Sequence, residues 1–215
     1  VLGISPVAAV VERRLRFSLI VIRPDGSPGQ ECELTHPTVF LGRTEGDILL
    51  PDDPLVSRHH ARFTVLGEQL YVEDLGSSNG TFVRLRKPHT LKHDDIILAG
   101  RQMFRFRECQ SKEPGAENQP AAQPPSSARA EAPAELVRLL PGGVEENHYP
   151  LQAGENILGR TRGTLTFPED AYLSSQHAKV KYEGGKFILE DLQATNGTFV
   201  RIRPCALLDD GDIIL

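Results

Sequence analysis

The sequence predicts an all-β chain built from two small β-sandwich domains. Short segments alternate between apolar and polar residues, as in 61–66, where Ala61, Phe63 and Val65 share one face. No long segment has helical periodicity, and turn residues separate the apolar segments at regular spacing. A third observation is an internal repeat. Together these features are typical of a duplicated β-sandwich.

The repeat relates residues 19–98 to residues 136–215 without a gap, at a constant offset of 117 positions. It includes the equivalent pairs Arg43 and Arg160, Ser57 and Ser174, His60 and His177, and Asn79 and Asn196. A register this long indicates a duplicated domain.

Each copy contains several expected strands. In the first copy they are 16–23, 61–66, 69–75 and 80–85, and in the second copy 177–182, 186–192 and 197–202. The first copy continues with an alternating segment, 103–107, which we expect to be a further strand. The second copy stops at Leu215, so we expect it to be truncated and to lack this final strand, with the natural protein continuing.

The repeat also predicts the domain organisation. We expect an N-terminal extension at 1–14, a first domain at 15–107, a flexible linker at 108–134 and a second domain at 135–215. The linker is rich in Pro, Ala, Gln and Glu and has almost no large apolar residue. Because it cannot bury enough apolar surface to order itself, we expect a disordered connection.

Composition excludes several classes of function. The 215 residues are 39% hydrophobic and 25% charged, with a net charge of −5 and no dominant basic stripe, so no nucleic-acid partner is expected. The three cysteines show no metal-ligand or disulfide-framework spacing, which predicts no metal and a reducing, cytoplasmic setting. The apolar segment 1–11 is too short to span a bilayer, so no membrane partner is expected.

The turns carry three motifs in the same order in both copies. The first copy has Leu-Gly-Arg at 41–43, Ser-Arg-His-His at 57–60 and Ser-Asn-Gly-Thr at 78–81; the second has Leu-Gly-Arg at 158–160, Ser-Ser-Gln-His at 174–177 and Thr-Asn-Gly-Thr at 195–198. Both copies closely resemble the forkhead-associated (FHA) domain. The resemblance covers the chain except the first dozen residues and the linker, and it implies a two-sheet sandwich that binds phosphothreonine in the loops at one end.

The resemblance also implies a role for each motif residue. Arg43 and Arg160 would supply guanidinium groups, whose planar fork suits phosphate. The alternative is a surface arginine, paired for Arg43 with Glu45 or Asp47. Ser57 and Ser174 would donate hydroxyl hydrogen bonds to the phosphate, although a lone loop serine is usually a turn former.

The neighbouring positions complete the implied site. Arg58 and Ser175, which follow the serines, would contact the phosphopeptide, and Ser78 and Thr195 would line the phosphate pocket. Asn79 and Asn196 would bond the peptide backbone, while Asn-Gly also forms tight turns. The structural motif residues are Gly42, His60, Gly80, Gly159, His177 and Gly197.

The expected function is phosphothreonine-dependent peptide binding that recruits phosphorylated partners in Ser/Thr-kinase signalling, with a kinase or its substrates as candidate partners. The alternatives are a phosphorylation-independent FHA scaffold, or a regulatory region of a larger protein with an output domain elsewhere. No P-loop, HExxH or kinase-type motif is present, so no enzyme, catalytic residue or cofactor is expected. The loops Glu45-Gly46-Asp47 and Arg162-Gly163-Thr164 differ, which predicts distinct peptide preferences.

Overall fold

The computed structural model describes residues 16–23, 26–109 and 133–215. Strands without any helix make up the regular structure of these residues, which confirms the all-β class. The expected extension at 1–14 and residues 110–132 of the expected linker lie outside the described residues. Within the described ranges no helix could span a membrane.

The strands follow the repeat in both copies. Those of the first copy are β1 (Ser18–Ile22), β2 (Pro28–Glu33), β3 (Thr38–Gly42), β4 (Ile48–Leu49), β5 (Ala61–Leu66), β6 (Gln69–Asp74), β7 (Phe82–Arg84), β8 (His89–Thr90), β9 (Ile96–Ala99) and β10 (Gln102–Glu108). Those of the second copy are β11 (Ala134–Leu139), β12 (Glu145–Leu151), β13 (Glu155–Gly159), β14 (Leu165–Thr166), β15 (Ala178–Glu183), β16 (Lys186–Asp191), β17 (Thr198–Arg201) and β18 (Cys205–Leu208).

Every strand expected from alternation is present. The expected segment 61–66 coincides with β5, and 186–192 exceeds β16 by one residue. The expected strand at 103–107 lies inside β10, whose even-numbered residues from 102 to 106 are buried. The strands that the sequence predicts therefore agree with those of the structure to within one or two residues at each end.

Contacts divide the chain into two compact units that do not follow the two sequence copies. Unit 1 contains the described residues up to Ser78 together with Pro204–Asp210, and unit 2 contains those of Asn79–Arg203 together with Gly211–Leu215. Each unit thus includes strands from both copies. The domain boundaries expected at 15–107 and 135–215 describe the two sequence copies and stay a prediction.

Unit 1 consists of two sheets. A five-stranded sheet has the order β18-β6-β5-β3-β4, and β1 pairs with β2 in a two-stranded sheet. The strand β18 of the second copy pairs antiparallel with β6, with Cys205 opposite Glu73 and Leu208 opposite Leu70.

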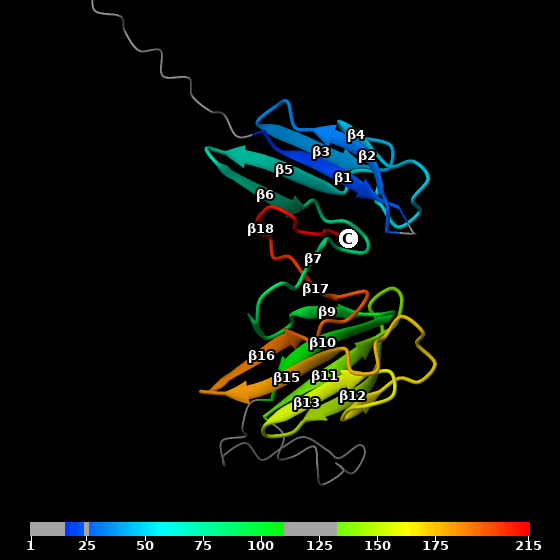
Figure 1. Cartoon of the computed structure of the whole chain (residues 1–215), viewed down its shortest axis with the longest axis vertical. Coiled ribbons are helices and arrows are strands. Elements are labelled where there is room, and N and C mark those ends of the chain that lie inside the picture. The colour runs from blue at the N-terminus through cyan, green and yellow to red at the C-terminus, as the bar shows by residue number, and fades with distance from the viewer. Residues whose placement is uncertain (1–15, 24–25, 110–132) are drawn as a thin grey trace, which may run out of the picture. The chain divides into compact units, whose positions relative to one another are not determined.

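Unit 2 is a sandwich of a six-stranded and a five-stranded sheet, seen in Figure 1 as the strands β7 to β17. The six-stranded sheet has the order β12-β11-β10-β9-β17-β7, and the five-stranded sheet has the order β14-β13-β15-β16-β8. First-copy strands β7, β9 and β10 therefore make up half of the six-stranded sheet, and first-copy strand β8 adds an edge to the five-stranded sheet. β10 runs antiparallel to β11, with Phe106 opposite Leu136.

The core of unit 2 lies between these two sheets and depends on first-copy side chains. Phe104 and Phe106 of β10 are fully buried, with ring centroids 5.6 Å from Phe167 and 5.1 Å from Phe187 respectively. Full burial of a phenylalanine stabilises a fold by roughly 1.5–3 kcal/mol. The two aromatic residues of β10 thus contribute about 3–6 kcal/mol to this unit.

Candidate phosphopeptide site

The loop before β15 is organised around Ser174, whose backbone N–H, backbone carbonyl and Oγ each form a hydrogen bond. Its backbone N–H donates to Nδ1 of His177 at 3.1 Å, and its carbonyl accepts from the N–H of Arg160 at 2.8 Å. Its Oγ accepts from the N–H of Thr195 at 3.2 Å. This one serine therefore connects three loops of unit 2 and brings together three of the predicted site residues.

The first copy repeats this arrangement within unit 1. The N–H of Ser57 donates to Nδ1 of His60 at 3.0 Å, and its carbonyl accepts from the N–H of Arg43 at 2.9 Å. The N–H of Ser78 donates to Oγ of Ser57 at 3.0 Å. Two independent copies of the sequence thus produce the same hydrogen-bonded frame.

A glycine before each arginine permits this close approach of the loops. A Cβ on Gly159 would collide with the carbonyl oxygen of Ser175, and one on Gly42 would collide with the carbonyl oxygen of Arg58. Both obstacles are backbone atoms, which cannot move aside as a flexible side chain could. The Gly-Arg motif therefore sets the spacing between the arginine loop and the serine loop.

The serine hydroxyl and the arginine have unused binding capacity. A hydroxyl has one donor hydrogen as well as its acceptor lone pairs, and the Oγ of Ser174 accepts from Thr195. Its hydrogen can therefore be donated to an incoming acceptor. Arg160 is half-buried, and neither it nor Arg43 forms an ion pair within the described residues.

The acidic residues beside Arg43 are engaged elsewhere. Glu45 lies 3.8 Å from Arg58 in an exposed ion pair, and Asp47 accepts from the N–H of Phe40 at 2.8 Å. The alternative in which Arg43 is a surface arginine paired with Glu45 or Asp47 is thus not what the structure shows. Among the residues that the structure describes, no carboxylate pairs with its guanidinium and competes with a phosphate.

The position after the serine differs between the copies. Ser175 is exposed, and its Oγ lies 2.8 Å from Oγ1 of Thr161. Arg58 is also exposed, and its charge is partly offset by Glu45. The second copy instead has an exposed cation two residues after the site arginine, Arg162, without an ion pair in the described part of the chain.

The Asn-Gly turn of the second copy is held from both sides. Asn196 is exposed, and its Nδ2 donates to the carbonyl oxygen of Tyr172 at 2.8 Å. Asp191 accepts from the N–H of Ala194 at 2.8 Å, and from the N–H and Oγ1 of Thr198 at 3.0 and 3.1 Å. Sequence reasoning missed the contact to Tyr172, because no motif marks a backbone acceptor.

The corresponding residues of the first copy fall on the unit boundary. Ser78 ends the first segment of unit 1, whereas Asn79 and Gly80 begin unit 2. The first site is therefore defined here by Arg43 and the frame around Ser57. The second site lies wholly within unit 2.

His177 is the buried link between the serine loop and the Asn-Gly turn. Its Nδ1 accepts from Ser174, so its Nε2 carries the hydrogen that is donated to the carbonyl of Gly197 at 3.0 Å. Burial lowers the pKa of this imidazole below its ordinary value of 6.5, although the hydrogen bond to Gly197 acts in the opposite direction. His177 is thus neutral at pH 7, which suits a structural link.

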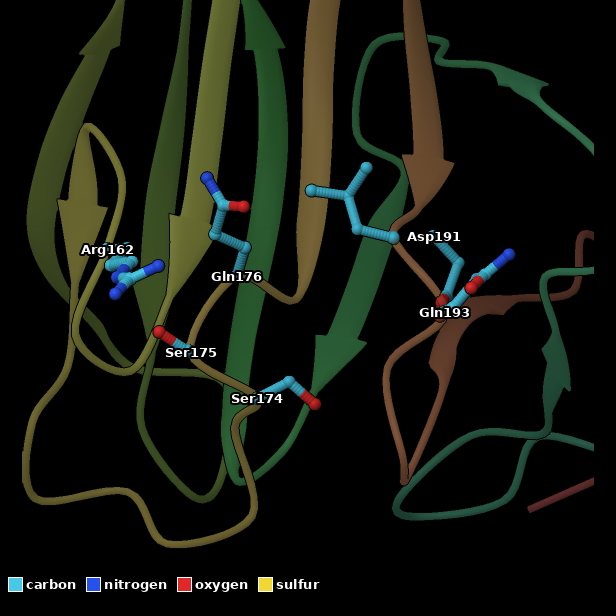
Figure 2. Close-up of a pocket in the computed structure, with 7 residues that line it drawn as sticks. Arg162, Ser174, Ser175, Gln176, Asp191 and Gln193 are labelled. Carbon is cyan, nitrogen blue, oxygen red and sulfur yellow. The ribbon is translucent and has the colours of Figure 1, made fainter.

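A shallow pocket of about 630 Å³ lies beside the serine loop. In Figure 2, Ser174 and Ser175 lie between Arg162 on one side and Asp191 and Gln193 on the other. Gln176 and Leu192 complete the lining, whereas Arg160, Thr195 and Asn196 are not part of it. The pocket therefore adjoins the predicted phosphate site and extends from it to Arg162. The first-copy residue equivalent to Arg162 is Glu45, so the two copies differ at this position.

The site has the chemistry of an anion-binding surface. Hydroxyl groups, guanidinium groups and a fixed loop frame suit the oxygens of a phosphate. No group of three or more His, Cys, Asp or Glu side chains that could hold a metal ion occurs in the ranges that the structure describes.

The FHA domain model matches residues 39–100 and 156–215, together more than half of the chain. The protein therefore belongs to the FHA domain family. Both matched regions include the Gly-Arg, Ser-x-x-His and Asn-Gly-Thr motifs or their equivalent residues.

Several curated bacterial proteins are similar to part of the chain. FHA domain-containing protein FhaB of Mycobacterium tuberculosis is 34% identical over 79 residues, which cover 37% of this chain and 51% of that protein. Glycogen accumulation regulator GarA of Mycolicibacterium smegmatis is 38% identical, covering 38% and 49%. The oxoglutarate dehydrogenase inhibitor of Corynebacterium glutamicum is 42% identical, covering 39% and 60%.

The chain spans about half the length of the curated relatives it matches. One solved structure, Mycobacterium tuberculosis EmbR in complex with a low affinity phosphopeptide, is 30% identical with a TM-score of 0.27. That match covers 43% of this chain and 24% of that chain.

Proposed function

We propose that this protein binds phosphothreonine-containing peptides through the loops around Ser174 and Ser57, and so recruits phosphorylated partners in Ser/Thr-kinase signalling. The observation that supports this most strongly is the duplicated frame, in which each serine hydroxyl accepts from a backbone N–H and keeps its own hydrogen for a ligand. A kinase or its substrates are the proposed partners, in the cytoplasm.

In the second site, Arg160 supplies the positive charge and Ser174 the short donor to the phosphate. A phosphothreonine carries about −1.5 to −2 charges and three strong acceptor oxygens. Thr195 holds the serine hydroxyl in place, and Asn196 lies beside it to bond the peptide backbone. In the first site, Arg43, Ser57, Arg58 and Ser78 have the corresponding proposed roles.

The role is one of binding and regulation, and none of these residues is assigned a catalytic step. Membership of the FHA family supports this, and so do relatives that are named as a regulator and as an inhibitor. His177 is unsuited to general base catalysis because both of its nitrogens are engaged by backbone groups.

The test is a titration with matched phosphothreonine, phosphoserine and unphosphorylated peptides. With Arg43→Ala disabling the first site, Arg160→Ala should weaken the remaining phosphopeptide binding by about 2–5 kcal/mol. Ser174→Ala should cost about 1.5–3 kcal/mol, because it removes a hydrogen bond to a charged group.

The control is Lys181→Ala, which removes a half-buried cation paired with Glu183 and Glu190 near the far end of β15. It should leave the affinity within twofold of the parent, about 0.4 kcal/mol or less. Equal binding of phosphorylated and unphosphorylated peptides would refute the proposal and favour a phosphorylation-independent scaffold.

A further inference from the structure

The turn that joins β9 to β10 in the first copy contacts the loop that precedes Ser174 in the second copy. The N–H of Arg101 and the Nε2 of Gln102 both donate to Oδ2 of Asp170 at 2.8 Å. Asp170 is 3% exposed. Burial would raise the pKa of this carboxyl, but the hydrogen bonds from Gln102 and the backbone lower it below its ordinary value. The first copy thus stabilises a buried anion of the second through these hydrogen bonds.

A second contact continues from the turn towards the site. The guanidinium carbon of Arg101 lies 4.4 Å from the ring centroid of Tyr172, close enough for a cation–π interaction. The N–H of Tyr172 donates to Oδ1 of Asp170 at 3.0 Å, and its carbonyl accepts from Asn196 at 2.8 Å. The residue proposed to bond the peptide backbone is therefore fixed by a residue that the first copy positions.

The turn also fits closely against the residue before Ser174. Gly100 has φ of +58°, and a Cβ there would lie 2.9 Å from Cγ of Leu173 and 3.0 Å from Oδ2 of Asp170. Leu173 is 2% exposed and belongs to the core of unit 2. Movement of the turn would therefore disturb the backbone that leads into the serine loop.

We propose that the β9–β10 turn of the first copy, Gly100 to Gln102, is a positioning element of the second copy's phosphopeptide site. This inference rests on the proposed function and adds that the second site is built from both copies. Asp170 accepts hydrogen bonds from the turn, and the carbonyl of Tyr172 in the same loop holds the side chain of Asn196. Arg101 and Gln102 are positioning residues, because they act on the ligand only through the 170–173 loop.

Because of the repeat, each copy has an equivalent loop against which the β9–β10 turn could pack. Asp53 and Leu55 are the first-copy equivalents of Asp170 and Tyr172, at the same offset of 117. Asp53 makes the matching local bond, accepting from the N–H of Leu55 at 2.9 Å. Leu55 has no aromatic ring, so an arginine cannot stack on it as Arg101 stacks on Tyr172. That contact favours docking of the turn on the second copy.

The test measures phosphothreonine-peptide affinity of the whole chain with the first site disabled by Arg43→Ala. We expect Arg101→Ala combined with Gln102→Leu to weaken binding about fivefold to twentyfold, since both positioning contacts are lost. Tyr172→Leu should weaken binding similarly, and adding Arg101→Ala to it should have little further effect. Arg101→Lys should restore most of the affinity lost in Arg101→Ala.

A cross-linking measurement tests the docking itself. With Cys32, Cys109 and Cys205 replaced by serine, we expect a disulfide between Arg107→Cys and Glu135→Cys, which face each other across β10 and β11. A disulfide between Arg107→Cys and Ser18→Cys instead would show that β10 pairs with its own copy, and would overturn the inference.

The outcomes separate the two proposals. If Arg160→Ala abolishes binding while the Arg101 and Gln102 variants bind within twofold of the parent, the proposed function stands and this inference is wrong. If the parent chain shows no phosphate-dependent binding, both are wrong.

Discussion

Asp191 offers a quantitative test of how the Asn-Gly turn of the second copy is built. Its carboxylate accepts three hydrogen bonds, one from Ala194 and two from Thr198, which is fully buried. Asp191→Ala removes all three and leaves a buried N–H and a buried hydroxyl without their acceptor. Each hydrogen bond to a charged group contributes about 1.5–3 kcal/mol, and the three share one carboxylate. We therefore expect a loss of about 3–5 kcal/mol from the stability of unit 2.

Native-state hydrogen exchange measured by mass spectrometry is a suitable assay, because it reports on β15 and β16 without requiring that the whole chain unfold in one step. Thr198→Val is the matched control: it removes only the hydroxyl bond and should cost about 1–2 kcal/mol. A loss below about 1 kcal/mol for Asp191→Ala, or one no larger than for Thr198→Val, would refute this account of the turn.

Three further predictions concern single positions. As pH falls through about 6.5, the imidazole of His177 takes up a proton in the unfolded chain but stays neutral in the folded chain, so the free energy of unfolding should fall by up to about 1.4 kcal/mol per pH unit. His177→Asn should reduce this slope of stability against pH, and an unchanged slope would contradict the prediction. Gln193 has φ of +59°, so Gln193→Gly should stabilise the turn by up to about 1 kcal/mol in hydrogen exchange, whereas destabilisation would contradict this. Arg162→Glu should weaken second-site binding of phosphopeptides that have acidic residues next to the phosphothreonine about fivefold to tenfold in titrations. Phosphopeptides with neutral residues at those positions are the control, and an equal loss of affinity for both kinds of peptide would argue against a selectivity role.

Local features of the fold were accessible from the sequence. Alternation located β5 and β10, because one face of each strand is buried and the other is not. The Ser-x-x-His spacing likewise reflects a short-range contact, in which the N–H of Ser174 donates to His177 three residues later. Structural features that depend on residues close together in the chain therefore leave a recognisable pattern in the sequence.

Features that depend on distant partners left no such pattern. The sequence predicts that β10 is a strand with one apolar face, but β1 and β11 are equivalent by the repeat, so alternation cannot say which of them it joins. The contacts from Arg101 to Asp170 and Tyr172 are equally invisible, since the residues lie about 70 positions apart. Even Asn196, singled out by its motif, has a partner at Tyr172 that only the folded chain reveals.

The exchange of strands between copies also sets an order of events during synthesis. The ribosome completes β10 long before β17, which joins the same sheet, and at about 5–20 residues per second the interval is roughly 5–20 s. During that interval Phe104 and Phe106 have been made but the core that buries them has not. Unit 2 therefore completes its six-stranded sheet only after nearly the whole second repeat has emerged, and the apolar face of β10 lacks its full set of packing partners until then.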